Sequence, residues 1–402
     1  MHLFAIATIT PFLLILTASF AGGVWGWLAV GYITALVFVL DHLIAVQTGN
    51  ADPEAEFPAA DNLLKILGGL HFLLLGCVLW AVAGPNALTW VERALAALSA
   101  ALAFGQISHP VAHELIHRPS RRLRLMGKLI YTSILFGHHA SAHVRVHHVH
   151  VGSKNDPNSA RWGEGFYRFL LRAWPGGFRA GLQAETRLRR NLQTSWRAHP
   201  YALYVGGAVA MCLVSLAMAG GAGLATLIFL SLYAQIQIFL SDYVQHYGLR
   251  RATLADGTPE PVGPRHSWNT PHWYSSAMTL NAPRHSDHHM TPSRPYPALQ
   301  LRDGDMPVLP YSLPVMAVLA LLPPLWRKVM DPLCAQWQPD WDGKPKADAR
   351  SISPAVLARA KAGGVGTTDL PHSPHENDRD SIVHSDQHPG RDGPGPDERR
   401  RV

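Results

Sequence analysis

Charged residues are scarce in this chain of 402 residues. Asp, Glu, Lys and Arg together make up 16% of it, whereas a soluble domain usually carries about 25%. The shortfall argues against a soluble globular protein and favours a membrane protein. The mean hydropathy is only +0.03, because apolar residues are concentrated in blocks and polar residues fill the gaps between them. Local windows are therefore more informative than the mean.

Cysteine is also scarce, with three residues that lie far apart: Cys77, Cys212 and Cys334. No Cys-x-x-Cys pair is present, which excludes a disulfide framework and a cysteine-based zinc module. The net charge is +7, and a basic chain raises the question of nucleic-acid binding. Here the basic residues flank apolar runs and no aromatic-basic motif accompanies them, so we expect no nucleic-acid partner.

Six apolar runs are long enough to cross a bilayer as helices, which takes about 18–20 residues. Gly-Gly pairs at 22–23 and 220–221 are expected to make tight turns between consecutive runs. A seventh run, 313–329, is short and contains two prolines, so we expect an interfacial or re-entrant helix there. The predicted fold is an all-α polytopic membrane protein whose six transmembrane helices cover 3–20, 23–46, 63–83, 91–110, 201–220 and 221–241.

The distribution of lysine and arginine predicts the orientation of the chain. Residues 118–197 contain 15 Lys and Arg against 3 Asp and Glu, so this segment is expected to face the cytoplasm at an inner (plasma) membrane. Alternate crossings then place the N-terminus and region 242–312 on the same side. The connection 47–62 would also be cytoplasmic although it is acidic, which is tolerated because acidic residues contribute little to topology.

Five consecutive segments follow from this topology. The composition changes near Asp340, and the tail that follows is rich in Pro, Gly, Asp, Arg and His with few large apolar residues, which predicts disorder. The expected segments are 1–111 with transmembrane helices 1–4, 112–200 as a cytoplasmic helical segment, 201–242 with transmembrane helices 5–6, 243–338 as a second cytoplasmic segment with an interfacial helix, and 339–402 as a disordered tail.

The 23 histidines are the compositional anomaly, and many of them gather in four short segments. The first is His113-Glu-Leu-Ile-His117, in which the two histidines stand four residues apart and share one face of a helix. This string matches the H-E-x-x-H motif of zinc proteases. A zinc protease needs one further ligand and an open water position, but it does not need the other histidine pairs of this chain.

The other three segments supply seven more histidines. His143 and His147 again stand four apart on one helix face, and His148 is turned by about 100° from His147, so neighbouring histidines can address two metals. The third segment holds one histidine, and the fourth repeats the paired arrangement. The nine candidate metal ligands are His113, His117, His143, His147, His148, His246, His285, His288 and His289.

The predicted topology places all four segments on the cytoplasmic face at similar depth, as a histidine-rich di-metal cap. Crowded imidazoles repel one another if protonated and need partners when buried, and a metal supplies such partners. Nine imidazoles are too many for one metal and enough for two with open positions. Imidazole suits iron, zinc, copper and nickel, so the ligands alone do not identify the metal.

The four segments read HELIHR at 113–118, H-x-x-x-H-H at 143–148, QHYGL at 245–249 and RHSDHH at 284–289. These strings resemble the histidine boxes of bacterial membrane-bound alkane monooxygenases, within the wider membrane fatty acid desaturase and hydroxylase superfamily. The resemblance covers roughly 20–337 and extends to Asp156-Pro157, to HSWN at 266–269, to PPLW at 323–326 and to MDP at 330–332.

This resemblance implies a six-helix membrane fold, O₂ as a co-substrate, and two non-haem iron ions bound by the nine histidines. It also implies electrons delivered by rubredoxin from a flavin-dependent reductase, and hydroxylation of the terminal methyl group of an alkane. Such a substrate has no polar handle, so its binding should come from apolar burial, worth about 0.8 kcal/mol per CH₂. We therefore expect a channel between the spans that opens to the lipid and ends at the metals.

Two boxes depart from the family pattern. In the second box Ala142 and Val146 stand where the family commonly has Glu and Gly, and in the third Asp242 and Gln245 replace Asn and Glu. The changed residues resemble those of the aromatic-methyl (xylene) monooxygenases, whereas the Ser-Asp pair of the fourth box resembles the alkane enzymes. An aromatic-methyl monooxygenase is therefore an open alternative.

Rivals from other classes are also open at this point. A fatty-acyl desaturase or lipid hydroxylase would use the same metals on a different substrate. A zinc protease would rest on His113, Glu114 and His117. A metal transporter should line the middle of the membrane with its ligands rather than gather them at one face.

Two acidic residues are candidates for catalytic support. Asp287 is expected to accept an N–H from a ligand histidine and to orient it, with a solvated loop aspartate as the equal alternative. Glu114 is expected to make a structural bond or to orient ligands. Six further histidines flank the boxes, and an ordinary hydrogen-bonded role is the better interpretation for His109, His138, His139, His150, His266 and His272.

Overall fold

The computed structural model of the chain describes residues 1–44, 49–195 and 198–338. The disordered tail predicted at 339–402 and the last two residues of the predicted span 23–46 lie outside these residues. Within them the secondary structure is helical, apart from two isolated β-bridges at Thr253 with Pro259 and Asn269 with Val308. The all-α class is confirmed for the part of the chain that the structure describes.

Five helical stretches are long and apolar enough to cross a membrane. The first four match the predicted runs, and two of them contain a π turn, at Tyr32–Leu36 and at Phe104–Ser108. These four stretches are α1 His2–Ala21, α2 Val24–Gly31 with α3 Val37–Leu43, α4 Pro58–Ala83, and α5 Trp90–Ala103 with α6 His109–His117.

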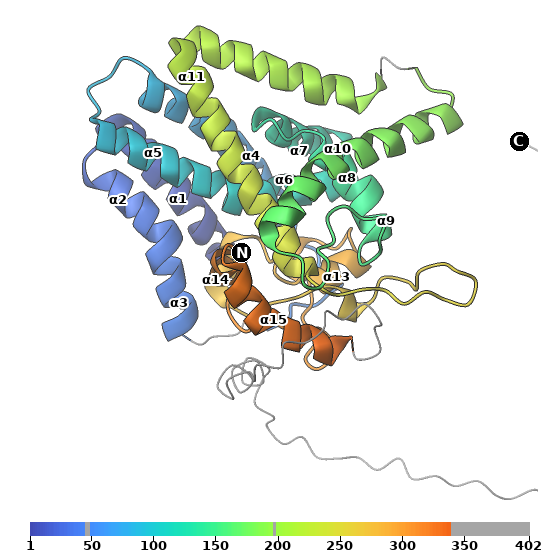
Figure 1. The fold of residues 1–402 in the computed structure, drawn as a ribbon. Coiled ribbons are helices and arrows are strands. Elements are labelled where there is room, and N and C mark those ends of the chain that lie inside the picture. The colour runs from blue at the N-terminus through green and yellow to red at the C-terminus, as the bar shows by residue number, and fades with distance from the viewer. Residues whose placement is uncertain (45–48, 196–197, 339–402) are drawn as a thin grey trace, which may run out of the picture. The chain divides into compact units, whose positions relative to one another are not determined.

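The fifth stretch, α11 Pro200–His246, is 47 residues long and covers both runs predicted at 201–220 and 221–241. A straight helix of that length would measure about 70 Å, more than twice the ~30 Å hydrocarbon core of a bilayer. The backbone leaves helical geometry at Ala219 and Gly220, where Gly220 has a φ of 59° that glycine adopts without steric cost. The two halves meet at a sharp angle (Figure 1). The count of six spans stays a prediction.

A second glycine turn joins the first two spans as expected. Gly22 and Gly23 both have a φ of 61°, and a Cβ on Gly22 would lie 2.4 Å from the Glu92 carboxylate. That carboxylate accepts the N–H of Gly23 and of Thr89, and the Thr89 hydroxyl accepts the Glu92 N–H in return. The turn is thereby tied to the start of α5.

Further helices follow the fourth and fifth stretches. After α6 come α7 Arg121–Ser133, α8 His139–Ala142, a π turn at His143–His147, α9 His148–His150 and α10 Phe166–Asn191. After α11 come α12 Trp273–Met278, α13 His285–Met290, α14 Leu313–Ala320 and α15 Pro323–Trp337. The predicted run 313–329 is thus split before Pro323, and neither α14 nor α15 is long enough to span.

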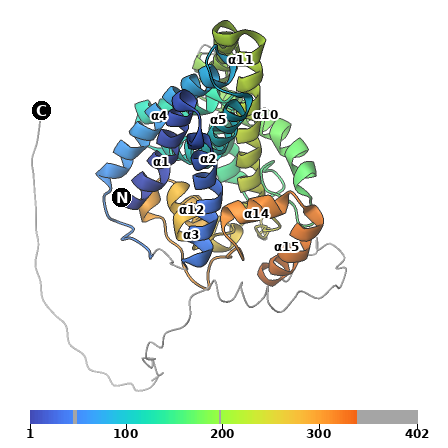
Figure 2. The same ribbon diagram turned by 90° about the vertical axis from the view of Figure 1, so that its left-hand side faces the viewer.

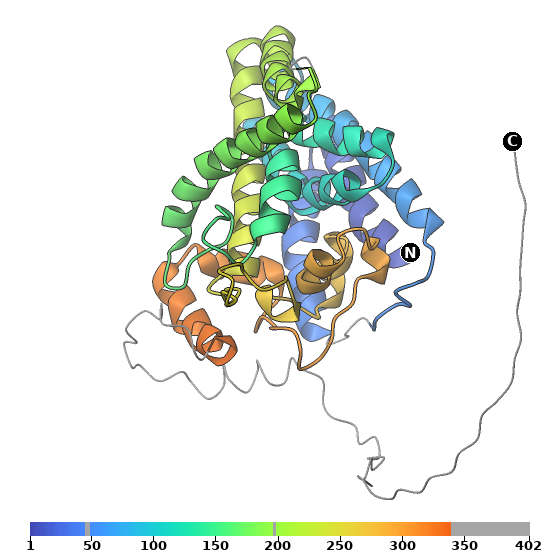
Figure 3. The ribbon, with the colours of Figure 1, turned by 90° about the vertical axis from the view of Figure 1, so that its right-hand side faces the viewer.

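Figure 2 shows α1, α2, α4, α5 and α11 side by side at one end of the described part, and α12, α14 and α15 at the other. Figure 3 shows the same division from the opposite side. Inside the bundle, the buried His71 of α4 lies 2.9 Å from Ser108 Oγ and 2.8 Å from Ser133 Oγ. This polar contact links α4 to α7 and to the turn that precedes the first histidine box.

Candidate metal centre

Four segments that are far apart in the sequence bring nine imidazoles together. His113 and His117 come from α6, and His246 is the last residue of α11. The stretch 143–148 forms a π turn and the start of α9, and the stretch 285–289 forms most of α13. All nine predicted ligands are assembled at one place in the fold.

The nine histidines separate into two groups. Within each group, one ring nitrogen per residue lies within 4.8 Å of those of the other members. The five-histidine group consists of His113, His117, His143, His148 and His288. The four-histidine group consists of His147, His246, His285 and His289. This division agrees with the prediction of enough ligands for two metals.

Ring nitrogens in the five-histidine group approach one another in a way that hydrogen bonds do not explain. His143 Nε2 lies 2.8 Å from His113 Nε2 and 2.9 Å from His148 Nε2. His148 Nε2 is in turn 3.1 Å from His288 Nε2. One ring nitrogen offers a single N–H or a single lone pair, so neither His143 nor His148 can make two full hydrogen bonds through Nε2.

The same spacing recurs in the four-histidine group, where His285 Nε2 lies 3.0 Å from His246 Nε2 and 3.1 Å from His289 Nε2. A metal explains both sets, because two nitrogens bound to one ion at about 2.1 Å and at right angles are about 3.0 Å apart. The Nε2 atoms of His117 and His147 are buried, and none of the described residues hydrogen-bonds to them. The donors and their spacing fit one ion in each group.

Residues four apart share a group where the backbone is α-helical. His113 and His117 on α6 do so, as do the first and fifth residues of α13. His143 and His147 do not, which corrects the expectation that they share a face. They begin and end a π turn closed by a hydrogen bond from the His148 N–H to the His143 carbonyl, and this wider turn changes the register of the side chains.

Adjacent histidines point into different groups, as the sequence predicted. His147 belongs to the four-histidine group and His148 to the five-histidine group. His288 and His289 are divided in the same way, with His288 in the five-histidine group. The cause is the rotation of about 100° between consecutive positions of a helix. The second box and α13 therefore each contribute histidines to both groups.

Burial keeps most of these imidazoles neutral. It lowers the pKa of His143, His148, His288 and His289 well below the ordinary value, and neighbouring imidazoles lower it further. Burial is also the main reason that the pKa of His285 falls to about 3. A neutral imidazole presents the lone pair that a metal requires. The groups are thus in the form that binds metal near neutral pH.

His147 is the exception, and it reveals a partner that sequence reasoning did not single out. Its Nδ1 lies 2.8 Å from Asp156 Oδ2, and both side chains are buried. Burial alone lowers the pKa of His147, but the Asp156 carboxylate outweighs burial and the pKa is raised. Ser159 Oγ donates to the same carboxylate at 2.6 Å. Such a carboxylate–histidine pair orients a metal ligand. In the sequence, Asp156 is marked only by the Asp-Pro string that belongs to the family resemblance.

Both departures in the third box have partners in the fold. Asp242 Oδ2 accepts a hydrogen bond from Asn158 Nδ2 at 2.6 Å, which connects α11 to the loop that carries Asp156. Gln245 Nε2 donates to the Ala282 carbonyl at 3.0 Å, which connects α11 to the segment before α13. The two substitutions therefore join the third box to the second and the fourth.

Glu114 makes the structural bond that was expected. Its Oε2 accepts from the Arg118 guanidinium at 3.2 Å and from the Tyr296 N–H at 3.3 Å. Arg118 also pairs with Asp61 at 3.0 Å. In a zinc protease this glutamate is the general base, and here it is engaged by a buried ion pair.

Asp287 does not make the predicted contact with a histidine. Its carboxylate accepts from the Arg294 guanidinium and, at 2.9 Å, from the Gln300 N–H. The Nδ1 atoms of the three α13 histidines have no hydrogen-bond partner among the described residues. A cation seven residues downstream is a stronger partner for a carboxylate than a neutral imidazole N–H. Asp287 therefore anchors the segment that follows α13.

Two flanking histidines have the ordinary hydrogen-bonded role that was expected. His109 Nδ1 lies 3.0 Å from the Tyr131 hydroxyl. His266 Nε2 lies 3.0 Å from a Glu260 carboxylate oxygen. Neither belongs to the groups in which the ring nitrogens converge.

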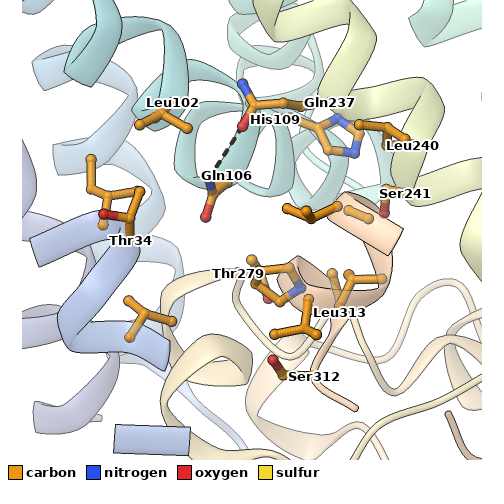
Figure 4. A pocket seen from close by; sticks show the side chains of 18 of the residues that line it. Thr34, Leu102, Gln106, His109, Gln237, Leu240, Ser241, Thr279, Ser312 and Leu313 are labelled. Carbon is orange, nitrogen blue, oxygen red and sulfur yellow. Dashed lines mark hydrogen bonds between the residues drawn. The ribbon is translucent and has the colours of Figure 1, made fainter. Parts of the chain in front are cut away.

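A cavity of about 550 Å³ lies between the spans, and none of the nine grouped histidines is among its described wall residues. Its wall comes from the second and fourth spans, α11 and α14 (Figure 4). His109, one helical turn before His113, forms part of this wall. Phe38 and Val318 also line it, and both are more than half exposed on the outside of the bundle. The cavity has the apolar lining expected of a substrate channel, and its connection to the histidine groups stays a prediction.

Comparison with known proteins agrees with this geometry. Residues 88–318, which contain all four boxes, match the fatty acid desaturase family. Alkane 1-monooxygenase 2 of Pseudomonas aeruginosa is 33% identical over 317 residues, covering 77% of this chain and 84% of that protein. Alkane 1-monooxygenase 1 of Alcanivorax borkumensis is 32% identical over 341 residues, covering 82% of each.

A relative with another name is similar over a greater length. The hydroxylase component XylM of the xylene/toluene monooxygenase of Pseudomonas putida is 28% identical over 356 residues, covering 87% of this chain and 92% of that protein. Together with the spanning helices and the converging imidazoles, these relatives identify a multi-pass membrane protein with a metal-binding site. The chain belongs to the alkane 1-monooxygenase family, within the fatty acid desaturase and hydroxylase superfamily.

Proposed function

We propose that this chain is a non-haem di-iron monooxygenase that hydroxylates the terminal methyl group of alkanes or similar apolar substrates. The observation that carries the proposal is the convergence of nine imidazoles into two groups, in a bundle of membrane-spanning helices with an apolar cavity that reaches His109. The nine histidines would hold one iron in each group. When bound, a reduced di-iron centre supplies the activation of O₂.

The number of imidazoles favours iron over zinc. Five imidazoles exceed the four ligands of a closed zinc site. Iron accepts imidazole ligands, and each group would hold one ion.

The residues of the chain have distinct tasks in this proposal. Apolar wall residues such as Leu102, Leu240 and Leu313 bury the alkyl chain, with about 0.8 kcal/mol gained per CH₂. Asp156 orients His147 through Nδ1 so that Nε2 faces the metal. Glu114 and Asp287, the two predicted catalytic residues, act as positioning residues through their hydrogen bonds and ion pairs.

The partners and the orientation are part of the same proposal. Electrons would come from a rubredoxin-type carrier with a flavin reductase, and O₂ is the co-substrate. The excess of Lys and Arg in 118–197 supports an inner-membrane protein whose site faces the cytoplasm, with six spans and with 112–200 and 243–338 as cytoplasmic segments. Reconstitution of NADH-dependent octane oxidation that requires both added proteins tests the electron route.

A second candidate, oxidation of an aromatic methyl group, is favoured by a specific observation. The departures at Ala142, Val146, Asp242 and Gln245 are similar to the xylene enzymes, and XylM matches the chain over 356 residues. Desaturation of a fatty-acyl chain is a third outcome to distinguish, since the matched family is that of the fatty acid desaturases.

Whole-cell conversion of octane, hexadecane and xylene tests these candidates together. We expect 1-octanol and 1-hexadecanol from wild-type cells and no product from a His147→Ala variant. His150→Ala is the matched control, because His150 lies in the same segment but in neither group. A methylbenzyl alcohol as the main product selects the aromatic candidate. If the membrane lipids are altered and neither an alkane nor an arene is oxidised, the proposal is wrong.

A further inference from the structure

Helix α10 has an exposed apolar stripe as well as a buried face. The stripe residues are separated by four, three and four positions, so they lie along one line of the helix. They are 36–78% exposed, although each is large and mainly apolar. We call this set the α10 stripe, and it consists of Tyr167, Leu171, Trp174 and Phe178. A contiguous row of exposed apolar side chains marks an interaction surface.

Contacts at both ends of the α10 stripe connect it to neighbouring helices. The hydroxyl of Tyr201, the second residue of α11, donates to the Phe178 carbonyl at 2.8 Å. Phe178 also lines a groove of about 340 Å³ together with Val209, which is exposed on the outer side of α11. At the other end, the Tyr167 hydroxyl donates to the Leu321 carbonyl at 3.0 Å, between α14 and α15. The stripe thus lies level with the start of a membrane-spanning stretch, where the surface of a bilayer is expected.

Two arginines lie along one edge of the stripe. Arg168 and Arg179 each directly follow a stripe residue, so both are turned by about 100° from the stripe in the same direction. The buried Ala173 and Gly177 each directly precede a stripe residue and are turned the opposite way. Around its circumference, α10 therefore has a face packed on the protein, an exposed apolar stripe and a basic edge.

Neither of these arginines is neutralised within the described part of the chain. Arg172 differs from them, because it pairs with Glu164 at 2.8 Å. The one acidic residue of α10, Glu185, is buried and already paired. Arg168 and Arg179 are exposed and form no hydrogen bond or ion pair with a described residue. A guanidinium has a planar set of N–H donors that matches a phosphate, so these two cations are free to bind an anionic group.

The stripe and its basic edge together identify the partner by its chemistry. An amphipathic helix with large apolar side chains on one face and arginine beside them binds in the plane of a membrane surface. A zwitterionic headgroup carries an ammonium group that opposes the arginines, which favours an anionic lipid. We propose that α10 is a binding site for anionic phospholipids of the bilayer, with the α10 stripe at the upper ends of the acyl chains and with Arg168 and Arg179 on the phosphates. The lipid is a ligand here and not a substrate, so the inference goes beyond the proposed reaction.

Fluorescence quenching of Trp174 by brominated lipids tests this site. The full chain is reconstituted in vesicles of phosphatidylcholine and phosphatidylglycerol in which one lipid or the other is brominated at the same mole fraction. The signal of Trp174 is the difference between wild type and Trp174→Phe. We expect brominated phosphatidylglycerol to quench Trp174 more strongly than brominated phosphatidylcholine. Arg168→Gln and Arg179→Gln should each lower this preference roughly two- to fivefold, because one charge near the lipid phosphate is lost.

Lys154→Gln is the matched control, because Lys154 is an exposed cation in the loop before α10, and its loss should leave the preference unchanged. Unfolding temperatures equal to that of wild type show that the variants fold. Equal quenching by both brominated lipids in wild-type protein overturns the inference, as does a preference that survives both arginine substitutions. If the arginine variants keep the lipid preference and instead raise the KM for the reduced electron carrier, the basic edge docks a protein and the inference is wrong.

Discussion

The two histidine groups use the same residue type in different surroundings. Every member of the four-histidine group is buried, with side chains that are at most 5% exposed. In the five-histidine group His117 and His148 are only half-buried. The four-histidine group also has a carboxylate partner, because Asp156 holds His147. One group is enclosed and has a carboxylate partner, and the other has one more candidate ligand and greater access to solvent.

The number of histidines and their support by a carboxylate therefore differ between the two groups. A carboxylate that accepts the N–H of a metal-ligating histidine fixes the orientation of its ring. The Asp156 carboxylate belongs to the site with fewer ligands. Substitutions that remove a histidine or its carboxylate partner from one group at a time test whether the two groups differ in this way.

The largest effect is expected from the loss of one ligand in the smaller group. His285→Ala leaves three imidazoles there, and we expect the iron content to fall from two ions per chain toward one, with more than a 100-fold loss of activity. His148→Ala leaves four imidazoles in its group and should retain more iron. His266→Ala, outside both groups, is the control. Equal iron loss in the two ligand variants would remove the distinction between the groups.

The next effect concerns the support of His147. Asp156→Asn removes the charge that raises the pKa of His147 above the value set by burial, and with it the orientation of the ring. We expect iron in the four-histidine group to be held 10- to 100-fold more weakly, measured by equilibrium dialysis against a graded series of chelator concentrations. Unchanged affinity in this variant would show that the carboxylate does not support the metal.

A chelator should remove iron from the two histidine groups at different rates. Because His117 and His148 are partly accessible and the four-histidine group is enclosed, a chelator should remove iron in two phases of about one ion each, with the five-histidine group emptied first. Stopped-flow absorbance of the chelate gives the two rates. In Asp156→Asn the slow phase should accelerate while the fast phase stays constant. A single phase in wild-type protein contradicts the difference in access.

The smallest effect is expected from Asp287, although it lies between two ligand histidines. Its partners are Arg294 and Gln300 and not a histidine, so Asp287→Asn should keep activity within about threefold of wild type and lower the unfolding temperature instead. Iron content and thermal unfolding in the same preparation distinguish the two. A loss of iron as large as that of Asp156→Asn would give Asp287 the orienting role that the geometry assigns to Asp156.

Much of the fold is visible in the sequence because its signals are local. Long apolar runs predict the spanning helices, and the glycine pairs mark the turn at Gly22 and the break near Gly220. The spacing of His113 and His117, and the rotation between His147 and His148, assign residues to groups wherever the backbone is helical. These inferences need only helix geometry.

The failures have a common cause in backbone geometry and competing contacts. The spacing of His143 and His147 suggests a shared face, but a π turn separates them. Asp287 has the position of an orienting carboxylate, but Arg294 outcompetes the neutral histidines. Asp156 carries out that task from a loop nine residues after His147. No local pattern distinguishes these two aspartates.

Residue order and spacing were sufficient to establish an all-helical membrane protein with nine histidines suited to two metals, because hydrophobicity and helical periodicity act over a few residues. Which histidines of distant boxes form one group, and which carboxylate supports them, depend on packing between helices. Those contacts join residues far apart in the chain, such as His113 and His288, whose ring centroids are 4.4 Å apart, and they arise only when the whole bundle is assembled.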